Sequence, residues 1–198
     1  MKTDSLILSF DTSAAHCAAA LSSNDAVLDS IYEPMEKGQN ERLIVLLEDL
    51  LTRQNASWSD LDAVAVGVGP GNFTGIRIGI SAARGLSLGL DIPAYGINGF
   101  EQRKDVLKEN GLNCVPAPRD QFFVDLPEGP QLLSQDEAEQ LGQPILPDPD
   151  PLLLVSAIGN LARAAWPTPP ATPPAPLYIK PPDAAPSRDA PPQILDDA

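Results

Sequence analysis

The sequence contains few of the residues from which metal centres and hydrolytic sites are usually built. A single histidine, His16, and two cysteines, Cys17 and Cys114, occur among 198 residues. One histidine cannot supply the His-x-x-x-His pair of a zinc protease, and a Ser-His-Asp triad would have to be built around the same residue. Two cysteines at this spacing indicate neither a zinc motif nor a disulfide framework. We therefore expect no hydrolytic or metal site, and two cysteines buried as small apolar side chains.

Positive charge is also scarce. Lysine and arginine number 13 against 27 aspartates and glutamates, which gives a net charge of −14. Negative charge opposes the approach of a polyanion such as RNA, because its phosphates must be neutralised by positive side chains. We expect the chain alone to bind RNA poorly unless a partner provides a positive surface. Acidity that serves only solubility would explain the same composition.

Long apolar stretches are absent as well. No run approaches the roughly 20 apolar residues that a bilayer-spanning helix needs, and residues 1–4 lack the basic start of a signal peptide. With 43% hydrophobic residues, the composition is that of an ordinary globular protein with a core. We therefore expect the protein in the cytoplasm.

The first part of the chain has the pattern of three strands followed by a helix. Residues 5–10, 16–22 and 26–32 alternate or are rich in small apolar side chains, and they predict an antiparallel meander. Asn40 can then cap a helix that ends near Asn55. Leucines recur in this helix at steps of three and four residues, which gathers them on one face. These leucines are Leu43, Leu46, Leu47, Leu50 and Leu51.

Strands and helices alternate in the next segment. The apolar run at residues 63–68 predicts a strand covered on both faces, and a helix follows to about Gly89. Residues 92–97 predict another strand and residues 99–109 another helix. The complete order is three strands, helix, strand, helix, strand, helix. It matches the ribonuclease H-like unit of the actin, sugar kinase and Hsp70 superfamily.

The signals beyond residue 111 are weaker. Residues 121–126 have the pattern of a strand, Ser134 and Glu137 form a capping box, and Asp150-Pro151 opens a helix through Trp166. From Pro167 onward prolines dominate, which favours an extended linker over a packed core.

We therefore predict an α/β protein in three parts. A ribonuclease H-like lobe occupies residues 1–111, an abbreviated second lobe residues 112–166, and a proline-rich linker and tail residues 167–198. Relatives that clamp ATP between two full lobes need a longer second lobe than this chain has.

A glycine-rich turn at residues 67–75 joins the predicted strand to the helix that follows it. Such turns can hold an anion on backbone N–H groups. A dinucleotide fingerprint, however, requires glycine where Asn72 stands, and a P-loop requires lysine and a hydroxyl residue where Ile76 and Arg77 stand. We expect these glycines to permit a tight turn and a close neighbour, and we expect no bound cofactor.

Asp11-Thr12-Ser13 follows the first strand, where kinases of this superfamily place an acidic residue and a phosphate-gripping loop. Asp11 could orient a hydrated magnesium ion, but the loop glycine of those kinases is missing. An aspartate that bonds its own backbone in a turn explains the same residue.

The helix at residues 74–89 carries two stripes. Gly75, Gly79 and Ala82 form one with little side-chain bulk, and a neighbouring stripe that starts at Ile76 carries larger apolar groups. The larger stripe should face the sheet. Because glycine inside a helix costs about 1 kcal/mol relative to alanine, the smooth stripe suggests that another backbone comes close. Either a partner or the chain itself could supply that backbone.

One long motif resembles a known family nearly residue for residue. The segment from Gly69 to Gly79, Gly-Pro-Gly-Asn-Phe-Thr-Gly-Ile-Arg-Ile-Gly, is similar to the signature of the bacterial TsaB family, also called YeaZ. Residues 10–13, 40–43 and 177–184 support the resemblance, which is strong from residue 6 to residue 99.

The resemblance implies a non-catalytic scaffold. Members of the family heterodimerise with the paralogue TsaD, which performs the transfer of a threonylcarbamoyl group to the adenosine next to the tRNA anticodon. An ATPase, TsaE, joins them, and tRNA is reached only through the complex. The free chain could pair with itself. We expect the partner interface at Leu43, Leu46, Leu47, Leu50, Gly75, Arg77, Gly79, Ala82 and Leu86.

The alternative is a small autonomous ATP-binding enzyme related to the sugar kinases. It would use Asp11 and the glycine turn. A metallopeptidase is a third alternative, and the single histidine argues against it.

Overall fold

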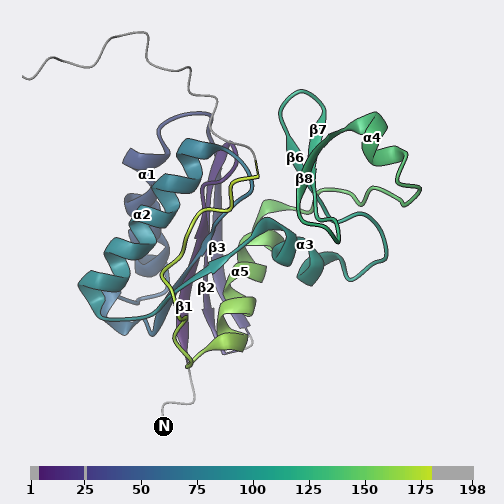
Figure 1. The fold of residues 1–198 in the computed structure, drawn as a ribbon. Coiled ribbons are helices and arrows are strands. Elements are labelled where there is room, and N and C mark those ends of the chain that lie inside the picture. The colour runs from purple at the N-terminus through teal and green to yellow at the C-terminus, as the bar shows by residue number, and fades with distance from the viewer. Residues whose placement is uncertain (1–4, 25, 180–198) are drawn as a thin grey trace, which may run out of the picture.

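A five-stranded sheet forms the centre of the computed structural model, which describes residues 5–24 and 26–179 (Figure 1). Its strands lie in the order β3-β2-β1-β4-β5. The first three form the predicted antiparallel meander, and β4 and β5 run parallel to β1. The strands are β1 (Leu6–Asp11), β2 (His16–Ser23), β3 (Ala26–Pro34), β4 (Ala63–Gly67) and β5 (Ala94–Ile97).

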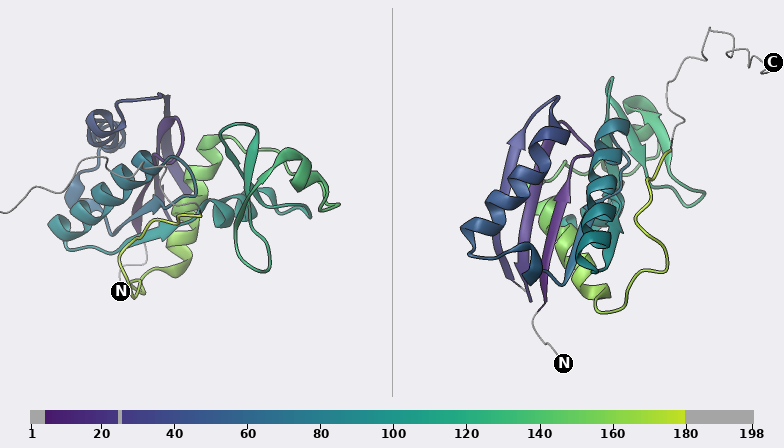
Figure 2. Two further views of the ribbon diagram at one scale, coloured as in Figure 1. Left: turned by 45° about the horizontal axis from the view of Figure 1, so that its top comes forward. Right: turned by 90° about the vertical axis from the view of Figure 1, so that its left-hand side faces the viewer.

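Helices cover both faces of this sheet. The helices α1 and α2 lie side by side on one face, and α5 crosses the other (Figure 2). The helix α3 follows β5 and packs against α5. The helices are α1 (Gln39–Arg53), α2 (Phe73–Leu90), α3 (Gly99–Leu107) and α5 (Pro151–Ala165), and a 3-10 turn, η1 (Trp58–Asp60), precedes β4. The predicted ribonuclease H-like lobe is thereby confirmed.

Alternation along the strands sorts the core into two layers. In β1, Phe10 is fully buried on the side of α1 and α2, whereas Ile7 faces α5. Successive side chains of a strand point to opposite faces, so a strand covered on both sides needs apolar residues throughout. The layer under α5 uses small residues such as Ala18. There α5 comes so close that a Cβ atom on Gly159 would lie 3.1 Å from Ser9 Oγ.

The start of α1 differs from the prediction that Asn40 caps it. The helix begins at Gln39, and the N-cap is Gly38, whose φ of 95° lies in the left-handed region that glycine tolerates. The predicted start of α5 is confirmed. Asp150 Oδ1 accepts a hydrogen bond from Leu152 N at 2.8 Å, and proline occupies the first turn.

A smaller sheet stands beside the large lobe (Figure 1). Three antiparallel strands and a short helix form it: β6 (Cys114–Ala117), β7 (Gln121–Val124), β8 (Gln131–Ser134) and α4 (Gln135–Glu139). The capping box of Ser134 and Glu137 is confirmed. The sequence pattern did not predict β6 and β8, because four-residue strands show no periodicity that separates them from loops.

The proposed division at residues 111 and 166 stays a prediction, but α5 packs with the large lobe rather than with the small sheet. Val155 and Ile158 of α5 lie in the core layer formed with β1, β2 and β4. Ser9 Oγ in β1 also donates a hydrogen bond to Val155 O at 2.9 Å. The chain therefore leaves the large lobe for the small sheet and then returns to it.

The proline-rich segment after α5 runs back along the large lobe. We call residues 167–179 the strap, which forms the yellow end of the ribbon in Figure 1. Pro174 O accepts a hydrogen bond from Arg84 Nε of α2 at 2.8 Å, and Leu177 N donates one to Val68 O at 2.8 Å. The strap is thus attached to α2 and to the end of β4. The rest of the predicted tail, from residue 180, lies outside the described residues.

The small-residue stripe of α2 is not left free for a partner at Gly75 and Gly79, contrary to our expectation. A Cβ atom on Gly75 would lie 1.9 Å from Thr12 O, and one on Gly79 would lie 2.8 Å from Thr12 Oγ1. Thr12 Oγ1 also donates a hydrogen bond to Gly75 O at 2.7 Å. The two glycines therefore let α2 reach the chain's own loop between β1 and β2.

This contact predicts opposite effects for two substitutions in one helix. Gly75→Ala should lower the free energy of unfolding by more than about 2 kcal/mol, because the added methyl group meets a backbone carbonyl. Gly85→Ala should raise it by up to about 1 kcal/mol, since nothing lies within 4 Å of its Cβ position. Urea denaturation followed by circular dichroism measures both. Equal effects would contradict the packing of Gly75 on Thr12.

Candidate partner surface and the cleft beside Asp11

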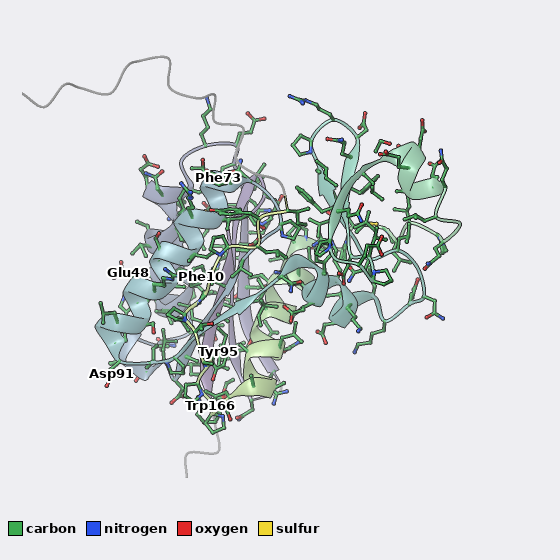
Figure 3. The ribbon with its side chains drawn as sticks, viewed as in Figure 1. Phe10, Glu48, Phe73, Asp91, Tyr95 and Trp166 are labelled. Atoms are coloured by element: carbon green, nitrogen blue, oxygen red, sulfur yellow. The ribbon has the colours of Figure 1, made fainter. Side chains whose placement is uncertain are left out.

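A groove of about 470 Å³ lies between α1 and α2 on the outer side of the large lobe. Its wall is mainly apolar and includes one charged side chain. The lining residues are Asn40, Leu43, Ile44, Phe73, Thr74, Arg77, Ile78, Ser81 and Ala82. Figure 3 shows Phe73 at the N-terminal end of α2 and Asp91 at the other end. The groove is therefore formed by the first half of each helix.

Most of the leucines predicted as partner contacts lie in the protein's own core. Leu46, Leu47 and Leu50 are fully buried beneath α1, and Leu43 is buried although it borders the groove. Their spacing of three and four residues marks the face of α1 that packs on the sheet. The leucine pattern is explained by this packing, so Leu46, Leu47 and Leu50 cannot contact a partner.

The apolar side chains that α1 leaves in water lie off that stripe. Ile44 is 43% exposed and Val45 is 48% exposed. On α2, Arg77 is exposed while Ala82 and Leu86 are half-buried, and of these Arg77 and Ala82 line the groove. The predicted partner contacts did not include Ile44 and Val45. The available signal was two β-branched apolar residues outside the leucine stripe of an amphipathic helix.

An ion pair holds α1 against the edge of the sheet. The guanidinium of Arg42 donates from Nε to Glu33 Oε2 at 2.7 Å and from Nη2 to Glu33 Oε1 at 2.6 Å. Arg42 Nη2 also donates to Asp49 Oδ2 at 2.9 Å. The hydrogen bond from Arg42 holds the pKa of Glu33 below its usual value. This bidentate contact links β3 to the helix that forms one wall of the groove.

Two aromatic rings hold the charged residue of the groove. The Cζ atom of Arg77 lies 3.8 Å from the centroid of the Phe73 ring, and Arg77 Nε donates to Tyr178 Oη at 2.9 Å. Tyr178 belongs to the strap, and its ring stacks on that of Phe73 with centroids 4.8 Å apart. The strap thus reaches one end of the groove.

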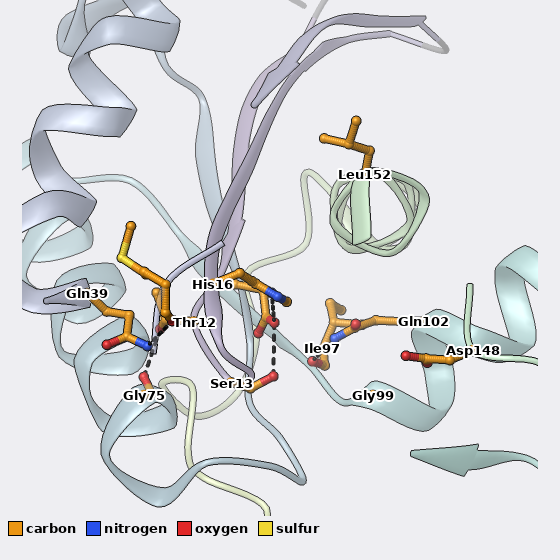
Figure 4. Close-up of polar contacts among 12 residues, drawn as sticks. Thr12, Ser13, His16, Gln39, Gly75, Ile97, Gly99, Gln102, Asp148 and Leu152 are labelled. Carbon is orange, nitrogen blue, oxygen red and sulfur yellow. Dashed lines mark hydrogen bonds and ion pairs between the residues drawn. The ribbon is translucent and has the colours of Figure 1, made fainter. Parts of the chain in front are cut away.

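A second hollow, of about 290 Å³, lies between the large lobe and α3 beside Asp11. Asp11 Oδ2 accepts a hydrogen bond from Ser13 Oγ at 2.9 Å and lies 3.1 Å from His16 Nε2. Figure 4 shows the side chains of His16 and Ser13 close to each other. In a catalytic triad the histidine stands between the serine and the carboxylate. Here the carboxylate stands in the middle, so His16 is not placed to activate Ser13.

The glycine turn beside this hollow is filled by the chain's own backbone. A Cβ atom on Gly71 would lie 2.3 Å from Ser13 O, and Asn72 N donates a hydrogen bond to Ser13 O at 2.6 Å. Thr12 O occupies the corresponding place at Gly75. Carbonyl oxygens carry partial negative charge, and a phosphate would meet them instead of free N–H groups. The turn is built as a packing contact.

One spacing typical of serine hydrolases does occur in the sequence, at residues 85–89, Gly-Leu-Ser-Leu-Gly. It lies inside α2, whereas a nucleophile elbow is a sharp turn between a strand and a helix. Ser87 Oγ donates a hydrogen bond to Ile92 O at 2.6 Å and so fixes the end of the helix.

Neither metal-ligand clusters nor membrane-spanning helices occur in the part of the chain that the structure describes. Residues 5–24 and 26–179 contain no group of three or more histidine, cysteine, aspartate or glutamate side chains placed to hold a metal ion. Over the same residues, no helix has both the length and the apolar character needed to cross a membrane.

Comparison with known proteins gives one consistent result. The family model for TsaD, tRNA N6-adenosine threonylcarbamoyltransferase, matches residues 33–103. The Escherichia coli K12 protein named tRNA threonylcarbamoyladenosine biosynthesis protein TsaB is 39% identical over 115 residues, which are 58% of this chain and 49% of that protein. A solved YeaZ structure from Pseudomonas aeruginosa is 26% identical, with a TM-score of 0.53 over 74% of this chain and 71% of that chain.

Over the matched residues, the chain is similar to proteins of the TsaB (YeaZ) family. A further solved Pseudomonas aeruginosa protein, described as similar to peptidase YeaZ, has the same fold with a TM-score of 0.69 and 22% identity, over 89% of this chain and all of that one. The chain spans about half the length of the TsaB relatives it matches.

The TsaD match covers both walls of the groove. Residues 33–103 run from the end of β3 through α1 and α2 into α3. The segment therefore includes every residue that lines the groove.

The Arg42–Glu33 pair predicts a pH-dependent loss of stability. Glu33→Gln should lower the free energy of unfolding at pH 7 by less than about 1 kcal/mol, because the pair is partly exposed. The pKa of Glu33 is lowered in the folded state, so its contribution is present above the pKa of an unfolded glutamate and is lost as the pH falls through the folded value.

The difference between wild type and Glu33→Gln should therefore shrink toward zero in acid. Thermal unfolding at pH 7 and near pH 3 measures it. Glu36→Gln is the matched control, since Glu36 is exposed and makes no ion pair with any residue that the structure describes. A difference that persists in acid would show that shape, not charge, holds α1 here.

Proposed function

We propose that this chain is the non-catalytic scaffold subunit of a tRNA threonylcarbamoyltransferase complex and that it heterodimerises with the TsaD paralogue. The exposed groove between α1 and α2 is the observation that carries the proposal. It is an apolar surface with exposed Ile44 on a protein of net charge −14, where most of the surface favours water. The names of the TsaB relatives support tRNA threonylcarbamoyladenosine biosynthesis as the process.

The match to the TsaD family model supports TsaD as the partner. It spans α1 and α2, so a TsaD subunit should carry a corresponding pair of helices. Two such pairs can pack as a four-helix arrangement. An interface of this kind buries about 1,200–2,000 Å² in total, which suffices for a stable complex. In the absence of TsaD, the same groove could pair two copies of this chain.

In this proposal the partner subunit carries out catalysis. The order Ser13–Asp11–His16 lacks an activated nucleophile, and the glycine turn is packed against carbonyl groups. A net charge of −14 opposes direct binding of tRNA, so tRNA contacts are assigned to other subunits. The ATPase TsaE completes the complex, which acts where tRNA is modified, in the cytoplasm.

The decisive test is size-exclusion chromatography of the chain with the TsaD paralogue of the same organism. We expect a 1:1 complex. Ile44→Asn should weaken it by at least about tenfold, because a polar amide would be buried without a partner. Leu153→Asn is the matched control: Leu153 is 54% exposed on α5, on the opposite face of the sheet, and its substitution should not change the affinity.

Failure of the wild-type chain to bind the paralogue would overturn the proposal. If both variants lose binding equally and circular dichroism shows both to be folded, the interface does not lie at the groove.

A second prediction separates the scaffold from the autonomous ATP-binding enzyme. Titration with a fluorescent ATP analogue up to millimolar concentration should give no saturable signal, because carbonyl oxygens occupy the glycine turn. The purified chain should also hydrolyse no ATP above the blank. Saturable binding that disappears in Asp11→Asn would favour the kinase-like enzyme instead.

A further inference from the structure

Arg77 is the one charged side chain that lines the groove between α1 and α2. Its guanidinium lies on the Phe73 ring, with 3.8 Å from Cζ to the ring centroid, and Nε donates to Tyr178 Oη at 2.9 Å. These contacts use the face of the guanidinium and its Nε hydrogen. The two terminal amino groups, which bind carboxylates in parallel pairs, are not needed for either contact.

Three arginines of the large lobe and α3 have carboxylate partners, whereas Arg84 of α2 donates to a backbone carbonyl, Pro174 O. Arg42 pairs with Glu33 and Asp49, Arg53 with Asp29, and Arg103 with Asp148. Within residues 5–24 and 26–179, Arg77 forms no such pair. Acidic residues outnumber basic ones about two to one in this protein, yet Arg77 lines an apolar groove without an acid beside it. Its side chain is nevertheless fixed, by the aromatic rings rather than by an acid.

We propose that Arg77 selects the partner by pairing with an aspartate or glutamate on the helix that packs into the groove. This inference rests on the proposed function, because it takes the occupant to be a helix of the TsaD-like subunit. The groove is apolar around a single positive charge, and a helix with one carboxylate in an apolar face is its electrostatic complement. Aromatic contacts that fix the guanidinium in advance reduce the entropy lost on pairing.

The strap positions the side chain of Arg77. Tyr178 is the strap residue that stacks on Phe73 and accepts the hydrogen bond of Arg77 Nε. Tyr178 is thus a positioning residue, which holds the guanidinium at the edge of the groove. Leu177, its neighbour, is attached to the end of β4 through Val68 O. The strap therefore connects the sheet to the charged end of the partner surface.

A carboxylate fits Arg77 better than a phosphate of tRNA does. The outer face of α1 carries the exposed acids Glu41, Glu48 and Asp49. These charges repel an extended polyanion along its whole length, whereas one carboxylate in an apolar helix face meets only Arg77 at close range. Binding of a tRNA phosphate is kept as a contrary outcome of the experiment.

The experiment measures the dissociation constant of the heterodimer at low and high salt, for wild type and for matched variants. Arg77→Met should weaken binding by about tenfold or more, and should flatten the dependence of the dissociation constant on salt. Arg77→Glu should weaken it by about a hundredfold or more, because two like charges would face each other. Lys104→Met, an equal change in net charge on exposed Lys104 of α3, should bind as wild type does.

Two further variants separate charge from shape. Arg77→Lys keeps the charge but loses the planar fork, and should lie between wild type and Arg77→Met. Tyr178→Phe keeps the ring and removes the hydroxyl group, so it should weaken binding a few-fold while retaining the salt dependence of wild type. Each acidic residue of the partner helix can also be replaced by arginine. One of these substitutions should restore binding to the Arg77→Glu variant, and the acid that it replaces is the predicted partner of Arg77.

The outcomes distinguish an error in the proposed function from an error in the role of Arg77. If wild type does not bind the TsaD paralogue, the proposed function itself is wrong. If wild type binds and Arg77→Met binds equally well with the same salt dependence, only the role of Arg77 is wrong. The same holds if Arg77→Met leaves the heterodimer unchanged but weakens tRNA binding to the complex. If the Arg77→Met variant does not fold, the affinity of Arg77→Lys and the salt dependence of wild-type binding test the role of Arg77.

Discussion

The packing of the glycine turn and α2 on the loop between β1 and β2 sets the position of everything that follows in the large lobe. Gly71 and Gly75 stand where a Cβ atom would lie within 2.3 Å of a backbone carbonyl oxygen of Ser13 or Thr12. No other residue fits such a place without moving the backbone. Because α2 is held there at its N-terminal end, its first half lies beside α1, and the groove between them has a fixed shape.

The same contact decides what this lobe can do chemically. In a nucleotide-binding lobe, the N–H groups of the glycine turn and the loop after β1 must remain open to phosphate. Here Asn72 N is bonded to Ser13 O, and Thr12 Oγ1 is bonded to Gly75 O. These N–H and hydroxyl groups are thus bonded within the chain, whereas Asp11 Oδ1 is buried without a hydrogen-bond partner among the described residues. These internal contacts agree with the scaffold role that we propose.

Charge gives the outer surface its specificity. The protein is strongly acidic, and its apolar groove carries a single fixed arginine. Apolar area alone would bind many helices with similar affinity, since area does not determine partner choice. A fixed charge in the groove penalises any helix that leaves it unpaired. The strap matters for the same reason, because Tyr178 comes from residues far from Arg77 in sequence and still holds it in place.

The sequence by itself determined the large lobe, whereas the structure was needed to show that the Gly-Leu-Ser-Leu-Gly spacing at residues 85–89 lies inside a helix. Strand alternation, the leucine stripe and the glycine-rich turn are local periodic signals, and they predicted β1 to β5, α1 and α2 because regular elements repeat every two or 3.6 residues. The short strands β6 and β8 gave no such signal. Ile44 and Val45 stand outside the leucine stripe, but their exposure depends on which face of α1 the sheet covers.

Only the tertiary structure decided which backbone approaches Gly75 and Gly79. A small-residue stripe says that something comes close, but not whether it belongs to the same chain, and here it is Thr12. Tertiary structure also returned α5 to the large lobe and placed Tyr178 against Phe73 and Arg77. These contacts join segments that lie far apart in the sequence, and no local pattern encodes them. Their physical cause is the burial of apolar surface between distant segments, which is settled only when the whole chain folds.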